Sequence, residues 1–163
     1  MTLDELPGYL RMLAARAGEA AIPAADTLGG EFRDAIKHRL TALSHERGTR
    51  TPAPAGGPPA KESGGLADSV RVVRYASTPV VATAVVGPNL PPRDAVQEFG
   101  GEMRARPGNR RGMVFFYDPP GWYHAQHVKV PPREYMVSTA KIVASDGSVA
   151  AGVAAAFYAA MWG

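Results

Sequence analysis

The amino-acid sequence predicts an α+β fold: N-terminal amphipathic helices and a C-terminal helix packed on a mostly antiparallel sheet, with a long Pro/Gly-rich loop. Apolar residues recur at steps of three and four over the first 46 residues, which is the period of a helix. β-branched and aromatic residues then dominate two later regions, each divided by a turn signal, as in hairpins. An alanine-rich end favours a final helix. This order of elements is typical of an α+β domain.

The length of 163 residues fits one domain over 1–163, long enough to bury a core without disulfides or metals. We expect a helical part (1–46), a flexible arm (47–65) and a sheet with a C-terminal helix (66–163). Cysteine is absent, which excludes a disulfide framework and a cysteine-based zinc site.

The first 46 residues predict two helical segments. Thr2 and Glu5 have the spacing of a capping box, and Pro23 is expected to begin or kink the second segment. The apolar stripe of the first segment is formed by Leu3, Leu6, Leu10 and Leu13. That of the second is formed by Leu28, Phe32, Ile36, Leu40 and Leu43. The second stripe needs a partner surface, for which the later strands are the candidate.

Residues 47–65 contain no large apolar side chain and are crowded with proline and glycine. Such a segment cannot offset the entropy lost on ordering, which predicts a mobile arm. A loop this long inside a compact domain usually contacts partners. Its glycines are no phosphate loop, because the tract follows a helix and contains many prolines.

Two hairpins are predicted beyond the arm. The first pairs residues 70–75 with residues 80–86, and a short helix at 93–99 follows and ends at Gly100, a natural C-cap. The second pairs residues 113–117 with residues 122–130 across Asp118-Pro119-Pro120-Gly121. Helices are then predicted over 136–144 and 149–161, separated by a turn at Asp146-Gly147.

The net charge of +3 is a mild basic excess, compatible with nucleic acid nearby without requiring it. Four arginines cluster in a predicted loop that faces either DNA or another partner, namely Arg104, Arg106, Arg110 and Arg111. The alternatives are a solvated loop and one that binds an anionic partner such as a phosphate backbone or an acidic neighbouring subunit.

No catalytic or cofactor motif is present in the sequence. His124 and His127 are three residues apart, but on a strand they point to opposite faces and cannot share a metal ion. The serines lack a nucleophile-elbow motif, and neither a Walker-type loop nor a dinucleotide fingerprint occurs. Aromatic residues at 115–117 and 122–123 could stack bases, although strand aromatics usually face a core or a subunit. We therefore expect a protein that is not an enzyme and needs no cofactor.

Neither secretion nor membrane insertion is expected. The segment Met1–Glu5 carries acidic residues where a secretory signal would carry Lys or Arg. The apolar C-terminal run is interrupted by Gly152 and rich in alanine, too weakly hydrophobic for a membrane span.

Three short motifs resemble those of the tail-completion proteins, the neck or head–tail joining proteins of long-tailed bacteriophages. Ser63–Val70 (SGGLADSV), which follows the Pro/Gly tract at a predicted strand start, is similar to their "Thr-Gly-x-Leu-x-x-Ser-Ile" motif. Gln97–Gly100 (QEFG) resembles their "Val-Glu-Phe-Gly", and Val130–Met136 (VPPREYM) their "Pro-Pro-Arg-Pro-Phe-Leu". With the N-terminal helix, the resemblance spans roughly residues 2–162. It departs from the family at Gly64, at Glu134 and in an extra hairpin with an Arg-rich loop.

The resemblance implies a structural virion protein that forms a ring, a hexamer, between the head connector or stopper and the tail terminator or tail tube. DNA would pass through its lumen without sequence specificity, and assembly would take place in the host cytoplasm. One sheet with helices on one face would leave apolar surface and sheet edges for neighbouring subunits. The residues assigned to subunit or ring contacts are Pro52, Pro54, Pro58, Pro59, Leu66, Val70, Phe99 and Tyr135.

Three alternatives remain open. The chain could be a basic nucleic-acid-binding module that uses the arginine cluster. It could be an enzyme with dispersed residues, such as a hydrolase using His124 or His127. It could also be another phage structural protein, either a tail terminator or a minor capsid component.

Overall fold

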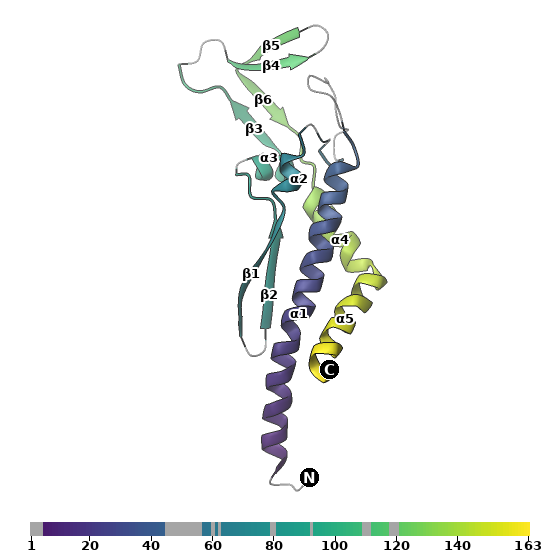
Figure 1. The fold of residues 1–163 in the computed structure, drawn as a ribbon. Helices are drawn as coiled ribbons and strands as arrows, with labels where there is room; N and C mark the ends of the chain where they lie inside the picture. The colour runs from purple at the N-terminus through teal and green to yellow at the C-terminus, as the bar shows by residue number, and fades with distance from the viewer. Residues whose placement is uncertain are drawn as a thin grey trace. The chain divides into compact units, whose positions relative to one another are not determined.

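The computed structural model in Figure 1 describes residues 5–44, 57–59, 61, 63–78, 81–91, 93–108, 112–117 and 121–163. The helices are α1 (Leu6–Thr41), α2 (Gly65–Asp68), α3 (Arg93–Phe99), α4 (Tyr135–Ser145) and α5 (Gly147–Trp162). The strands are β1 (Arg71–Thr78), β2 (Val81–Gly87), β3 (Gly101–Arg104), β4 (Met113–Tyr117), β5 (Gly121–Ala125) and β6 (His127–Val130).

The predicted α+β class is confirmed: a long N-terminal helix and a C-terminal helix accompany antiparallel strands. The described strands do not form one sheet, however. They pair as three two-stranded antiparallel sheets, β1–β2, β3–β6 and β4–β5. The expectation of a single sheet with helices on one face is therefore wrong.

The chain divides into two compact units, each made of segments distant in sequence. Unit 1 comprises Met1–Asp34, Arg71–Gly87 and Ala140–Gly163, and unit 2 comprises Ala35–Val70 and Pro88–Thr139. The boundaries fall inside α1 and α4, so each of these helices contributes residues to both units. The single domain over 1–163 stays a prediction.

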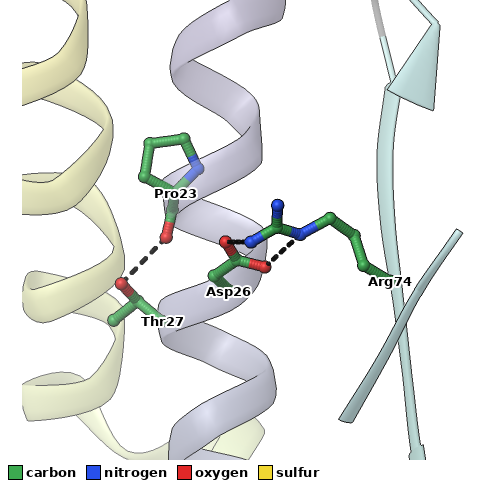
Figure 2. A network of polar contacts seen from close by, with 4 residues as sticks. All are labelled: Pro23, Asp26, Thr27 and Arg74. Carbon is green, nitrogen blue, oxygen red and sulfur yellow. Dashed lines mark hydrogen bonds and ion pairs between the residues drawn. The ribbon is translucent and has the colours of Figure 1, made fainter. Parts of the chain in front are cut away.

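Helix α1 continues through Pro23 instead of breaking there. Proline cannot donate a backbone hydrogen bond, and inside a helix it commonly costs about 3 kcal/mol. One turn later the Thr27 hydroxyl donates to the Pro23 carbonyl at 2.9 Å, as Figure 2 shows. The bend signal at Pro23 was thus read too strongly: the packed alanines Ala20 and Ala24 around it keep this part of the helix buried in the fold.

In unit 1, the β1–β2 hairpin packs on α1 where the helix carries Gly29. A Cβ at Gly29 would lie 3.0 Å from Val72 Cγ1 and 3.4 Å from Ala84 Cβ, so glycine permits this close approach. The Arg74 guanidinium of β1 also donates two hydrogen bonds to the Asp26 carboxylate of α1, one of them 2.9 Å long (Figure 2). The second α1 stripe therefore does meet the strands, as predicted.

In unit 2, β3 to β6 form a two-stranded ribbon whose return strand changes partners at Gln126. β3 pairs with β6 and β4 pairs with β5, and the Ala105 N–H donates to the Gln126 carbonyl at 2.9 Å between them. The predicted strand over residues 122–130 is thus two strands, β5 and β6. The turn at residues 118–120 lies outside the described residues.

The local predictions after residue 65 hold with one exception. The first hairpin, the helix at 93–99 and the two C-terminal helices are confirmed. The motif Ser63–Val70, expected at a strand start, instead forms the short helix α2. Gly64 precedes it with φ +83°, a conformation that glycine adopts readily.

Candidate functional site

The second and third motif segments meet in unit 2, although about thirty residues separate them in sequence. The Arg133 N–H donates to the Gln97 carbonyl at 3.0 Å, and the Glu134 N–H donates to the Glu98 carbonyl at 3.2 Å. These backbone bonds join the end of α3 to the segment that leads into α4.

The buried side chain of Glu98 caps the helix that begins at Tyr135. Its carboxylate accepts the N–H groups of Met136 and Val137, each at 2.9 Å. Only 3% of Glu98 is exposed. The first N–H groups of a helix have no partner within the helix, and the positive end of its dipole attracts a carboxylate. Glu98 is thus a charged group buried in a structural role.

Gly100 allows the same two segments to approach closely. Its φ is +73°, and a Cβ there would lie 2.8 Å from the Pro132 nitrogen and 2.9 Å from the Val130 carbonyl oxygen. Neither the backbone conformation nor the space accepts a larger residue. The glycine of the QEFG motif is therefore required by the fold of unit 2.

Tyr135 is completely buried beside this cap. Burial raises the pKa of its phenol, and the negative charges of Glu98 and Asp94 raise it further. Among the described residues its hydroxyl has no hydrogen-bond partner, and neither has Gln97 Oε1. The Tyr135 carbonyl accepts the hydroxyl of the buried Thr139 one turn later.

The first motif shares a pocket with the second. This pocket of unit 2 has a volume of about 230 Å³ and is lined by Leu40, Pro59, Lys61, Ser63, Gly64, Gly65, Leu66, Ala67, Leu90 and Gln97. Within it, α2 is anchored by the buried Ala67. All three motif segments therefore belong to one structural cluster, which we call the motif cluster: residues 63–70, 97–100 and 130–136.

The predicted arm is shorter in the structure than in the sequence. The Lys61 N–H donates to the Leu43 carbonyl at 2.6 Å, and Lys61 also forms an isolated β-bridge with Ser44. Gly65 already belongs to α2. The predicted contacts Pro52 and Pro54 lie outside the described residues, whereas Pro58 and Pro59 are half-buried.

The other predicted ring-contact residues divide into buried and exposed ones. Val70 and Tyr135 are 1% and 0% exposed, so their assignment as contact residues was wrong: both side chains fill the chain's own core. Leu66 is half-buried. Phe99, at 75% exposure, is the large apolar residue of this group that is open to a partner.

Two members of the arginine cluster can be placed. Arg104 lies at the end of β3 and forms an ion pair with Glu102 at 3.0 Å, and Arg106 is exposed. Arg110 and Arg111 lie outside the described residues. The Arg104 pair reduces the positive charge that this loop offers to a phosphate backbone.

Neither a metal site nor a simple membrane span is found in the part of the chain that the structure describes. No group of three or more His, Asp or Glu residues is placed to hold a metal ion there. No single helix in it is long and apolar enough to cross a membrane; α4 and α5 reach that length and composition only as a pair bent by 71°.

Unit 1 carries exposed apolar surface that the sequence interpretation did not assign to any function. Leu10 of α1 is 54% exposed, and Tyr158 and Trp162 of α5 are 62% and 63% exposed. The signal that could have indicated it is the absence of any charged residue after Asp146. A surface helix normally has a charged face.

No model of a known protein family matches the chain, and neither does any curated protein or solved structure.

Proposed function

We propose that this chain is a non-enzymatic subunit of a phage tail neck. In this proposal it assembles as a ring, a hexamer, that joins the head connector to the tail tube and surrounds the DNA passage. The observation that carries the proposal is the motif cluster. Three segments that resemble tail-completion motifs, distant in sequence, contact one another or line one pocket.

The chemistry of the motif cluster supports an architectural role. The Glu98 carboxylate is buried and holds two backbone N–H groups, and Gly100 is fixed by a close backbone approach. A catalytic carboxylate needs access to a substrate and to the proton it transfers. The motif residues would instead be kept in a family because they build the same fold.

The departure at Glu134 also has a structural reason. Glu134 has φ +45°, and proline, which the resembling motif has at this point, is restricted to φ near −65°. The chain therefore enters α4 by a different backbone path from one that a proline would permit. This difference places the chain, under the proposal, at some distance from the family pattern without disturbing the cap by Glu98.

A genetic experiment tests the proposal. Deleting the gene from the phage that encodes it should give DNA-filled heads and separate tails, and the intact gene supplied in trans should restore joined particles. A variant lacking residues 47–56 keeps the Lys61 contacts and should fold but fail to join heads to tails, because we assign this arm to a neighbouring ring. Unchanged infectious yield after gene deletion would refute the neck role.

The nucleic-acid-binding alternative predicts a different outcome. A basic module would bind duplex DNA as an isolated chain, with an affinity that falls steeply as salt rises. An Arg104→Gln, Arg106→Gln double variant would then lose DNA binding and biological function together. A ring subunit predicts weak binding alone and joined particles with this variant. A tail terminator or minor capsid component would differ in which particle part is lost on gene deletion.

A further inference from the structure

One apolar stripe of α1 is covered at one end and bare at the other. Leu6, Leu10, Leu13, Ala17, Ala20 and Ala24 follow each other at steps of three and four, which places them on one helix face. Ala20 and Ala24 are 0% and 8% exposed, whereas Leu6 and Leu10 are 36% and 54% exposed. Within unit 1, the first turns of α1 continue past the ends of the hairpin and of α5 (Figure 1).

The same unit also carries an uncharged groove. Residues of α1, α4 and α5 enclose a groove of about 530 Å³ whose walls include Leu28, Val143, Ala154 and Phe157. A second groove of about 470 Å³, between α1, β2 and α4, shares Leu28 and Val143 with it. No charged residue lines either groove, so an occupant that fits must present an uncharged face.

The chemistry of the groove indicates which helix fits it. Its walls already accept Ala24 and Leu28, residues of the chain's own α1. The bare turns around Leu10 present the same stripe, with the same spacing and no charge on that face. Exposed apolar surface of this extent commonly marks a protein contact, and a helix in an apolar groove is a recurrent mode of recognition.

We infer that the first turns of α1 in one copy dock into the α1–α4–α5 groove of a second copy. The two surfaces are different parts of one chain, so the contact is head-to-tail: each copy offers its helix to one neighbour and its groove to another. Such contacts close into a ring or continue as a filament. The inference does not depend on the neck role, since it concerns contacts between copies whatever the assembly joins.

Disulfide cross-linking tests this contact directly, because the chain has no cysteine of its own. Leu10→Cys and Ala154→Cys variants of the full chain are purified separately, mixed under reducing conditions that allow subunit exchange, and oxidised. The mixture should give a disulfide-linked dimer that neither variant gives alone. A chain carrying both substitutions should give a ladder of covalent oligomers.

A matched control uses the opposite face of the same turns. Ala15 is exposed and lies half a helical turn away from Leu6 on α1, so an Ala15→Cys variant mixed with Ala154→Cys should give at least tenfold less dimer. Leu10→Asp should abolish the oligomer in sedimentation velocity at a concentration where Ala15→Asp retains it. Circular dichroism checks that both variants keep their helices.

Three results would overturn the inference. The first is a mixture with no more dimer than the Ala15→Cys control, and the second is efficient dimer formation by Leu10→Cys alone, which would mean a two-fold symmetric contact. The third is flotation of the intact chain with phosphatidylcholine–phosphatidylglycerol vesicles that depends on Leu10 without any cross-link between copies. That result would assign the bare stripe to a membrane surface.

Discussion

The Glu98 carboxylate accepts the backbone N–H of Met136 at 2.9 Å, across 38 residues of sequence. A second bond from Val137 completes the cap on α4. The interaction joins two of the three motif segments by a charge at a helix N-terminus, where it is favourable. The motif cluster therefore depends on one buried acidic side chain.

Replacing Glu98 with glutamine should lower the free energy of unfolding by about 2–3 kcal/mol. The amide keeps one acceptor oxygen but turns its NH₂ group toward the second N–H donor. Urea denaturation of the full chain measures the loss. Glu102→Gln, at an exposed β3 position, is the control and should cost no more than about 1 kcal/mol; equal losses in the two variants would contradict the cap.

The buried phenol of Tyr135 should make the fold sensitive to alkaline pH. Its pKa is raised mainly by burial, with Glu98 and Asp94 adding to the effect, whereas the unfolded phenol ionises near pH 10. Stability is therefore fully present below that value and falls as the pH rises toward the folded-state pKa. The urea midpoint of Tyr135→Phe should fall less between pH 10 and 12 than that of the natural chain.

At pH 7 the same substitution should change the free energy of unfolding by less than about 1 kcal/mol. The reason is that the Tyr135 hydroxyl has no hydrogen-bond partner among the described residues. Tyr158→Phe, at an exposed position on α5, is the control for the alkaline series. If both variants followed the natural chain up to pH 12, Tyr135 would not be the responsible group.

The positive φ of Glu134 predicts opposite results for two substitutions. Glu134→Pro should destabilise the chain by about 3 kcal/mol, because proline cannot reach this conformation and lacks the N–H that donates to the Glu98 carbonyl. Glu134→Gly should remain within about 1 kcal/mol of the natural chain or be more stable. Thermal unfolding separates them; a proline variant as stable as the glycine variant would contradict this backbone geometry.

The Asp26–Arg74 pair should contribute only modestly, although two hydrogen bonds join its side chains. Arg74 is 62% exposed and Asp26 is 35% exposed, so water and salt screen the pair. A double-mutant cycle with Asp26→Asn and Arg74→Gln should give a coupling energy of about 0.5–1 kcal/mol that shrinks in 1 M salt. A salt-independent coupling above 2 kcal/mol would show a contribution that screening does not reach.

Elements defined by nearby residues could be predicted from the sequence. The β1–β2 hairpin has β-branched strands with a Pro-containing turn, and α3 ends at a glycine with φ +73°. The two C-terminal helices are likewise local patterns. For such elements the deciding interactions lie within a few residues, which is why the patterns located them.

Features that depend on distant contacts could not be predicted. Nothing near Glu98 indicates that it caps a helix 38 residues later, and the burial of Tyr135 follows from that packing. Pro23 was expected to interrupt a helix, but packing in unit 1 overrides this local preference. The bare stripe at Leu6 and Leu10 looked like a core-facing stripe in sequence, because periodicity shows which face is apolar and not what covers it.

The central claim, a neck ring, is tested most directly by locating the chain in the particle. Fab fragments raised against the purified chain would be bound to intact phage particles and imaged by electron microscopy. The account predicts Fab density confined to the head–tail junction, arranged around the axis as a ring. Fab density over the capsid shell or along the tail tube, or purified joined particles that lack the chain by mass spectrometry, would contradict it.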